Sequence, residues 1–502
     1  MSPSPQPLRA RRLGIHTHDE AVAYMRADCH VCRAEGLAQH SRIQLNSAAH
    51  EIIVTLHHVS SGLVGSDEVG LSESAWQRLE LREGDAVYAS HPRPVDSLGS
   101  VRRRVYGNRL ASEAFLPIIR DIVAGRYSDV HLASFITACA ALPLDRDETV
   151  ALTHAMVEVG ERLNWVGSPI LDKHSVGGLP GNRTTPIVVA VVAAHGLAMP
   201  KTSSRAITSP AGTADTMETL APVDLDLPAI RRVVEREYGC IVWGGAVRLS
   251  PADDVLIRVE RALDVDSEGQ LVASVLSKKI AAGSNHVVID MPVGATAKVR
   301  SPEAANALAA RLADVASVFG MQVRVVFTDG SQPVGRGIGP ALEAHDVLGV
   351  LQARSDARGD LKDRACALAG ALLELAGKAD SGHGHEIAQA TIADGRAWKK
   401  FQAICEAQGG MRVPPVASHR HPFLASRDGR IAVIDNRKIA RLAKLAGAPE
   451  VKAAGVALEA GLGQRVAAGQ PLCVVHAESR GELQYALDYV AANPDIIEIA
   501  AS

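Results

Sequence analysis

The chain has 502 residues, of which 47% are hydrophobic and 22% charged, so it can bury a large core beneath a charged surface. Its formal net charge of −3, from 53 basic and 56 acidic residues, supplies no strongly basic field and predicts no nucleic-acid partner. The longest apolar run, near 187–199, is too short to span a bilayer, so we expect no membrane partner. Seven scattered cysteines, and N-terminal arginines with no apolar stretch behind them, predict reduced thiols and a cytoplasmic protein.

Residues 1–95 are expected to form a β-rich, barrel-like domain. The segments 43–45, 52–56 and 85–89 have the composition of short strands, and Ser, Gly, His and Pro separate them. Prolines at 92 and 94 then mark a domain boundary.

A helical domain is predicted over residues 96–165. Apolar residues recur at helical spacing over 113–124, and a second helix is expected over 145–163. Its first turn is rich in acidic residues, which the helix dipole favours. A further contribution to this domain is expected from about 250–282.

Residues 166–340 predict an α/β phosphate-binding domain, because strands and helices alternate there. The expected strands are 169–171, 241–243, 286–290 and 322–326, and the expected helices are 183–195, 228–237 and 302–319. In such sheets, ligands bind at the carboxyl ends of the strands.

Residues 341–502 are expected to form a C-terminal α+β lobe, helix-rich to about 408 and with short strands from 418 onward. The predicted fold class is therefore α/β. It comprises a helical domain and a mixed α/β domain, flanked by the N-terminal β-rich domain and the C-terminal lobe.

A glycine-rich segment, 171–182, follows one predicted strand and precedes a predicted helix. Its glycines let backbone N–H groups approach an anion, and the helix N-terminus adds partial positive charge. Lys173 contributes a full positive charge and Ser175 a hydroxyl donor. The segment therefore indicates a phosphate site, although an ordinary glycine-rich turn would have the same pattern.

A second segment, 201–218, is dense in hydrogen-bond donors. It contains seven hydroxyl residues together with the cations Lys201 and Arg205. Such a density suits several phosphate oxygens. The alternative is a polar turn that only caps the next helix, with Thr213 or Asp215 as the cap.

In a third segment, 273–279, Ser274 and Lys278 are four residues apart and would share one face of a helix. A serine and a lysine on one face can bind a base carbonyl. The alternative is a solvated basic helix end.

These segments resemble the thymidine phosphorylase and pyrimidine-nucleoside phosphorylase family. The family signature, Ser-x-Arg followed by Gly-Thr-x-Asp-x-x-Glu, stands here at 203–205 and 212–218. Segments 249–253 and 328–335 are also similar to the family. The similarity is strongest to its long branch, the AMP phosphorylases and the bacterial type 2 thymidine phosphorylases. It covers the chain from about Val101 onward, and the N-terminal region matches only the long branch.

The resemblance implies roles for individual residues. The residues implied to hold the attacking phosphate are Lys173, Ser175, Ser203, Ser204 and Thr213. His174 would lie near the sugar and base, and Ser274 and Lys278 would contact the base. The long-branch nucleotide-binding positions correspond to Gly178, Ser204, Arg205, Ala206, Ile207, Thr208, Ser209, Thr213, Ser274 and Lys298. The proton donor of that branch corresponds to Asp266.

The sequence departs from the short branch at one base-binding position. Val259 stands where that branch has arginine, which leaves Arg258, one position earlier, as a candidate substrate contact. Asp266 could protonate a purine. The alternative is that Asp266 is only an exposed residue of the turn 266–269. Lys278 and His174 could instead stabilise a pyrimidinate.

The implied activity is phosphorolysis of the N-glycosidic bond of a nucleoside or a nucleoside 5′-monophosphate. Inorganic phosphate would be the co-substrate, with no metal or organic cofactor, and the relatives imply a homodimer. Closure of the domains would exclude water, with hinges expected near 165–172 and 245–285. Two alternatives remain: an anthranilate-type phosphoribosyltransferase and a non-catalytic nucleotide-binding protein.

The pair Cys29 and Cys32, with His16 and His18 nearby, could indicate a metal or redox site. A zinc site needs a second pair at regular spacing, which these histidines do not provide, so a structural role is favoured. Segment 455–475 resembles the β fold of biotin and lipoyl carriers without a modifiable lysine, which favours a structural lobe.

Overall fold

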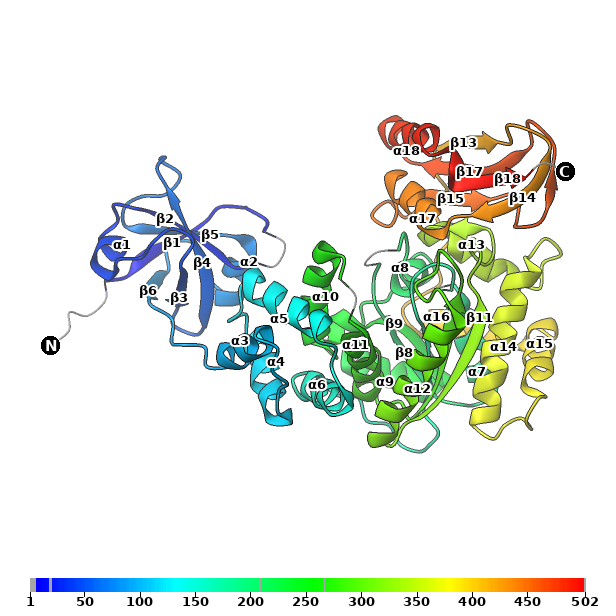
Figure 1. Ribbon diagram of the computed structural model, residues 1–502, viewed down its shortest axis with the longest axis horizontal. Helices are drawn as coiled ribbons and strands as arrows, with labels where there is room; N and C mark the ends of the chain where they lie inside the picture. The colour runs from blue at the N-terminus through cyan, green and yellow to red at the C-terminus, as the bar shows by residue number, and fades with distance from the viewer. Residues whose placement is uncertain (1–5, 18–19, 182, 207–208, 266, 501–502) are drawn as a thin grey trace. The chain divides into compact units, whose positions relative to one another are not determined.

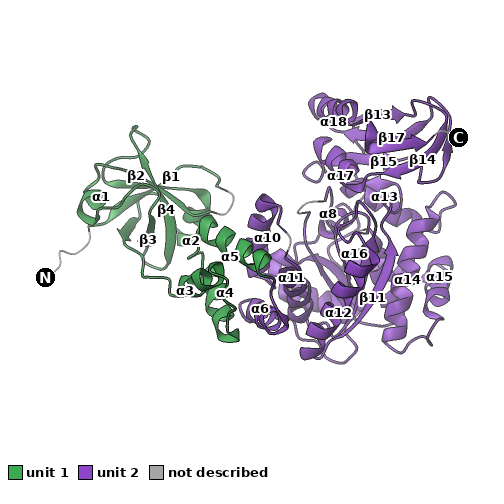
Figure 2. Ribbon diagram, viewed as in Figure 1, with its two compact units in different colours: residues 1–142 green, residues 143–502 purple. Residues whose placement is uncertain are grey.

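The structure is a computed structural model that describes residues 6–17, 20–181, 183–206, 209–265 and 267–500. It contains two compact units, residues 1–142 and residues 143–502, which Figure 2 colours separately. The expected fold class is confirmed: a six-stranded barrel, helical segments, an α/β part and a C-terminal α+β part all occur.

In the first unit, six strands close into a barrel in the order β1-β5-β2-β4-β3-β6 (Figure 1). The strands are β1 (Leu8–Arg12), β2 (Val22–Arg26), β3 (Arg42–Asn46), β4 (Glu51–Val59), β5 (Glu68–Leu71) and β6 (Ala86–Ser90). Along β3 only Ile43 and Leu45 are fully buried, which is the alternation expected of a strand with one face in the core. The short helices α1 (His30–Glu35) and α2 (Glu73–Leu79) pack on this core.

The rest of the first unit is helical. It contains α3 (Leu98–Val105), α4 (Phe115–Val123) and α5 (Asp129–Ala141). In α4 the buried residues Phe115, Ile118 and Ile122 recur at helical spacing.

The second unit begins with α6 (Arg146–Glu158), which packs on α11 (Glu268–Ala281). A reciprocal pair of hydrogen bonds between Asp145 and Glu148 caps the start of α6. The helix α10 (Pro251–Leu263) precedes α11 in the sequence, and both α10 and α11 face the cavity described below.

Two parallel sheets form the centre of the second unit. One has the order β11-β10-β7 and the other pairs β8 with β9. Their strands are β7 (Leu171–Ser175), β8 (Met199–Ser203), β9 (Gly239–Trp243), β10 (His286–Val293) and β11 (Gln322–Asp329). The connecting helices are α7 (Thr184–Ala194), α8 (Thr213–Glu218), α9 (Leu227–Glu237) and α12 (Pro302–Val318).

One expected strand lies further along the chain than predicted. The sequence predicts a strand over 169–171, whereas β7 runs from Leu171 to Ser175. The apolar pattern missed this extension because Asp172 and Lys173 are charged, yet both are buried in the sheet. The consequence is that Lys173 and Ser175 lie on a strand end and not on a loop.

Four helices follow β12 (Gly337–Ile338): α13 (Pro340–Leu351), α14 (Gly359–Leu375), α15 (Gly384–Ala393) and α16 (Arg396–Ala407). Together with helix α7, which is buried from Thr184 to Ala193, these helices enclose one hydrophobic core that includes Ile187, Leu372 and Phe401. They are therefore packed on the α/β part.

Residues 419–500, which we name the C-terminal β lobe, have a core of their own. One sheet has the order β12-β15-β17-β13 and the other β16-β14-β18. The strands of this lobe are β13 (His419–Leu424), β14 (Gly429–Ile434), β15 (Gly455–Leu458), β16 (Arg465–Val466), β17 (Pro471–Ala477) and β18 (Ile497–Ala500), with helices α17 (Asn436–Leu445) and α18 (Arg480–Ala492). Because β12 pairs with β15, the lobe is joined to the α/β part by a sheet.

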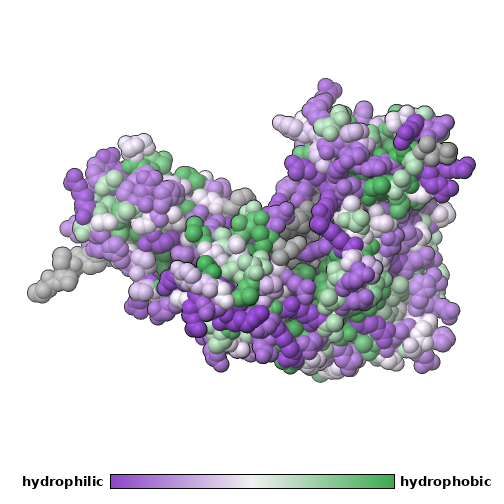
Figure 3. All heavy atoms as spheres, viewed as in Figure 1, coloured by the Kyte–Doolittle hydropathy of each residue, from purple (hydrophilic) through white to green (hydrophobic). Residues whose placement is uncertain are grey.

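On the face shown in Figure 3, hydrophilic residues predominate and hydrophobic ones occur in small groups. Among the described residues, no helix has the length and apolar character needed to cross a bilayer.

Candidate active site

A cavity of about 350 Å³ lies in the second unit, at the ends of β7 and β8 and beside α10 and α11. Most of the residues predicted from the sequence line it. These are Lys173, His174, Ser175, Gly178, Ser203, Ser204, Arg205, Ser209, Thr213, Ser274, Lys278 and Lys298. Segments from four separate stretches of the sequence therefore meet at one place.

Lys173 lies beneath one end of this cavity with a side chain that is only 1% exposed. Its Nζ donates to Ser175 Oγ and to Thr184 Oγ1, both at 2.8 Å, and lies 3.7 Å from Asp290 Oδ2. Burial lowers the pKa of Lys173 to about 8, although Asp290 opposes this shift. A cation with hydroxyl groups at a strand end is suited to bind a small anion.

A second group of buried charges adjoins Lys173. Asp172 is fully buried and its carboxylate lies 3.1 Å from Lys201 Nζ and 2.7 Å from Lys279 Nζ. Burial lowers the pKa of Lys279, and Asp172 opposes the shift. Both lysines line the cavity. Lys279 was not singled out from the sequence, because the sequence does not show which lysines of a basic segment point inward. Lys201 was expected only as one of the cations of the hydroxyl-rich segment, without a contact of its own.

The hydroxyl-rich segment forms another wall and also caps a helix. Gly212 is the N-cap of α8, and Asp215 accepts hydrogen bonds from the backbone N–H groups of Gly212 at 3.0 Å and Ala206 at 2.6 Å. The cap was expected at Thr213 or Asp215, so the sequence identified the capping carboxylate but placed the cap position wrongly. The same carboxylate that caps the helix therefore also shapes this wall of the cavity.

Two glycines allow the glycine-rich and hydroxyl-rich segments to approach each other. A Cβ at Gly178 would lie 2.5 Å from Ser209 Cβ, and one at Gly212 would lie 2.6 Å from the backbone of Arg205. A larger residue at either position would force the walls apart. Ser203 Oγ is buried and has no hydrogen-bond partner among the described residues, so a donor on this wall is available to a ligand.

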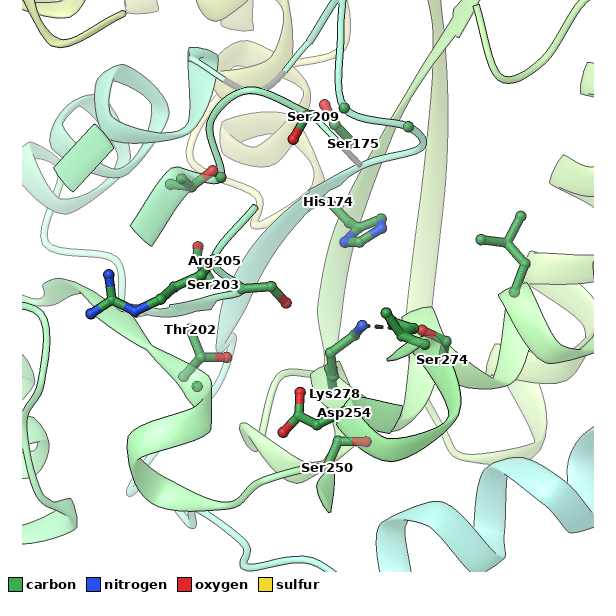
Figure 4. Close-up of a pocket in the computed structure, with 18 of the residues that line it drawn as sticks. His174, Ser175, Thr202, Ser203, Arg205, Ser209, Ser250, Asp254, Ser274 and Lys278 are labelled. Atoms are coloured by element: carbon green, nitrogen blue, oxygen red, sulfur yellow. Dashed lines mark hydrogen bonds between the residues drawn. The ribbon is translucent and has the colours of Figure 1, made fainter. Parts of the chain in front are cut away.

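The guanidinium group of Arg205 points away from the centre of the cavity (Figure 4). It pairs with both carboxylate oxygens of Glu218 at 2.8 Å and lies 4.8 Å from the ring centroid of Trp243. The hydrogen bonds to Glu218 raise the pKa of Arg205 and lower that of Glu218 to about 2. In this arrangement Arg205 stabilises the wall through its contacts with Glu218 and Trp243.

The opposite wall is built from α11 and α10. Lys278 Nζ donates to Asp253 Oδ2 at 2.7 Å and to Ser274 Oγ at 3.1 Å, as Figure 4 shows for the serine. Ser274 and Lys278 therefore share one helix face, as their spacing predicts. The imidazole of His174 lies between this wall and Ser203 (Figure 4).

Two further titratable groups of the cavity have shifted pKa values. Burial and the nearby lysines lower the pKa of His174 well below its usual range, so its imidazole is neutral at physiological pH. Burial and the neighbouring Asp253 raise the pKa of Asp254 to about 6. Asp254 was missed at the sequence level, where adjacent aspartates in a first helical turn indicate only a favourable interaction with the helix dipole.

Several predicted residues do not contribute a described side chain to the cavity. Ile207, Thr208 and Asp266 lie outside the described residues. Arg258 and Ala206 are described but do not line the cavity, and the Ala206 N–H bonds to Asp215 instead.

No group of three or more metal-ligating side chains occurs in the part of the chain that the structure describes. Cys29 is the N-cap of α1, and its Sγ accepts a hydrogen bond from the Cys32 N–H at 3.1 Å. Cys29 and Cys32 therefore have a structural role at the start of α1.

Three family matches cover most of the second unit and part of the first. Residues 167–398 match the α/β domain of the glycosyl transferase family, and residues 100–160 match its helical bundle domain. Residues 430–496 match the pyrimidine nucleoside phosphorylase C-terminal domain. The fold and the cavity thus define a pentosyltransferase of this glycosyl transferase family.

Full-length relatives narrow the assignment. Proteins described as "Putative thymidine phosphorylase" from Chelativorans sp. (strain BNC1), Sphingopyxis alaskensis and Polaromonas sp. are 64%, 61% and 58% identical to the chain. Each alignment covers 99% of this chain and 97–98% of the relative. The chain therefore belongs to the thymidine phosphorylase family, in its type 2 group.

A solved structure, anthranilate phosphoribosyltransferase from Thermus thermophilus, is similar in fold. It is 23% identical, with a TM-score of 0.53, and the similarity covers 62% of this chain and 99% of that one. This similarity supports the shared architecture of the α/β and helical parts.

Proposed function

We propose that the protein cleaves the N-glycosidic bond of a nucleoside or nucleoside 5′-monophosphate with inorganic phosphate as the attacking group. The products are the free base and a (deoxy)ribose 1-phosphate or ribose 1,5-bisphosphate. The observation that carries this proposal is one cavity with a buried Lys173 and hydroxyl groups on one side and the Ser274–Lys278 pair on the other. The family similarity supports the same activity.

Lys173 and the hydroxyl-rich wall would hold the phosphate. Cleavage builds positive charge on the sugar, and a phosphate fixed next to C1′ stabilises that charge before it forms the new bond. Holding both reactants in one cavity removes much of the entropic barrier. Ser175, Ser203, Ser204 and Thr213 line the cavity, and their hydroxyl groups would surround that anion.

Lys278 would stabilise the departing base, because its ammonium group can donate to a base carbonyl as negative charge develops. Neutral His174 can donate one hydrogen bond to the sugar or base without adding charge beside the sugar cation. Gly178, Ser209 and Lys298 also line the cavity and would contact the rest of the substrate. The proton donor implied by the long branch, Asp266, keeps that role as a proposal.

A panel of substrates tests the function. Purified protein is incubated with nucleosides and nucleoside 5′-monophosphates, with and without inorganic phosphate and without added metal. We expect base release only with phosphate, and the long-branch features favour a 5′-monophosphate as the best substrate. Base release that instead requires a divalent metal and pyrophosphate would support a phosphoribosyltransferase. Tight nucleotide binding without turnover would support a non-catalytic protein.

We also propose that the protein is a cytoplasmic homodimer. Sedimentation of the purified protein would measure its number of subunits.

The pH dependence of phosphate use should follow the charge of the buried Lys173. Lys173 has a pKa of about 8, and it loses its charge as the pH rises through that value. We therefore expect kcat/KM for phosphate to fall on the alkaline side with an apparent pKa near 8. Bound phosphate opposes deprotonation, so kcat at saturating phosphate should persist to higher pH. Initial rates between about pH 7 and pH 10 measure both profiles, and a flat kcat/KM to about pH 10 would contradict the assignment of Lys173.

A further inference from the structure

The C-terminal β lobe contacts two loops that line the cavity, although none of the residues lining the cavity belongs to that lobe. The first is the hydroxyl-rich segment 201–218, whose last residues form α8, and the second is the turn 294–299, which carries Lys298. The lobe reaches each loop through one polar side chain, Lys452 for the first and Asn436 for the second.

Lys452 contacts the base of the hydroxyl-rich wall. Its Nζ lies 3.2 Å from Asp215 Oδ1 and 2.9 Å from Glu218 Oε2. Asp215 is the buried carboxylate that accepts the backbone N–H groups of Ala206 and Gly212, so it sets the path of the loop.

The contact of Lys452 with Asp215 and Glu218 matters because of the charges that surround it. Asp215 and Glu218 are two neighbouring carboxylates, and Arg205 pairs with both of them. Arg205 also lies 3.5 Å from Asp224, so with Lys452 two cations face three carboxylates. Without Lys452, Arg205 alone would face all three. A buried carboxylate that loses a cationic partner favours other arrangements of the groups around it. Loss of Lys452 is therefore expected to loosen the loop without removing any group that touches the substrate.

Asn436 makes the corresponding contact at the second loop. Its Nδ2 donates to Thr296 Oγ1 and to the carbonyl oxygen of Gly330, both at 2.9 Å, and its backbone N–H donates to Thr296 Oγ1 at 3.2 Å. The side chain is buried. Thr296 lies two residues before Lys298, and a Cβ at Gly294 would lie 2.5 Å from the backbone of Gly330. Asn436 thus ties two closely packed turns to the start of α17.

We infer that the C-terminal β lobe positions the substrate loops of this enzyme, with Lys452 and Asn436 as its positioning residues. Lys452 fixes the wall assigned to phosphate, and Asn436 fixes the turn that presents Lys298 to the nucleoside part. The division into a phosphate side and a nucleoside side rests on the proposed function. The contacts themselves do not depend on it.

Kinetics of two variants test the division of roles. Lys452→Met should raise KM for phosphate about tenfold with a smaller change in kcat, and Lys452→Arg should restore most of the loss. Asn436→Ala should raise KM for the nucleoside or nucleotide about tenfold and leave KM for phosphate nearly unchanged. Lys438→Met is the matched control, because Lys438 pairs with Asp495 inside the lobe. Equal effects of the two variants on both KM values would overturn the inference.

Hydrogen exchange provides a readout that does not require turnover. In Lys452→Met, peptides that contain Ala206 and Gly212 should exchange faster than in the wild type, and peptides from β10 and α12 should not change. Exchange that stays unchanged in the loop, or that rises uniformly along the chain, would overturn the positioning role. A wild-type protein that releases no base would refute the proposed function alone, because the exchange result would still report whether Lys452 orders the loop.

Discussion

Replacing Lys173 by methionine is expected to lower kcat/KM for phosphate about a thousandfold, a loss of about 4 kcal/mol of transition-state stabilisation. The reason is that Lys173 is a buried cation at the end of β7 whose ammonium group meets two hydroxyl groups beside the cavity. Methionine keeps most of the length and the apolar character of the lysine stem but cannot attract or orient an anion. Initial rates at varied phosphate concentration measure the effect.

The control for this variant concerns folding. Asp290 loses its cationic neighbour in Lys173→Met, although it still accepts hydrogen bonds from Ser175 and Thr328 at 2.7 Å. The double variant Lys173→Met/Asp290→Asn removes both charges, so it should unfold at a higher temperature than the single variant while remaining inactive. Phosphate-dependent turnover within about tenfold of the wild type in a folded Lys173→Met protein would show that phosphate binds elsewhere.

Replacing Lys278 by methionine is expected to lower kcat by at least about a hundredfold, while KM for phosphate changes little. Lys278 lies on the wall opposite Lys173, where it would meet negative charge on the departing base. Ser274→Ala should have a milder effect, about tenfold, because it removes one neutral hydrogen bond. Steady-state kinetics with both substrates varied separate the two parameters.

The stability control uses the partner of Lys278. Its ammonium group lies 2.7 Å from Asp253, which is buried, so the single variant leaves an uncompensated carboxylate. Lys278→Met/Asp253→Asn should recover thermal stability without recovering activity. Recovery of activity in the double variant would mean that Lys278 serves only to neutralise Asp253.

Most of the fold could be predicted from local patterns of apolar and polar residues in the sequence. The closed barrel obeys the alternation seen at Ile43 and Leu45, and α6 begins near residue 145, where an acidic first turn predicts a helix. The strand β7 was misplaced because two of its buried side chains are charged, those of Asp172 and Lys173, and their burial depends on partners distant in sequence. Local composition cannot predict such a strand.

The candidate site was predictable where a motif fixes several residues together. The segments around Lys173, Ser203 and Lys278 all reach the cavity. Lys279 and Asp254 were missed, because their positions depend on how α11 and α10 meet the strands of the sheet. Conversely, Arg205 lies in the signature, but its ion pairs with Glu218 direct its charge away from the cavity centre.

The buried charges below the cavity do not cancel. Three ammonium groups, those of Lys173, Lys201 and Lys279, share two carboxylates, those of Asp172 and Asp290. The folded chain therefore retains mutual repulsion that an arriving dianion would relieve. An anionic reactant that binds here would neutralise the excess positive charge and so stabilise the folded protein. The same excess charge would therefore serve both substrate binding and the dependence of thermal stability on that substrate.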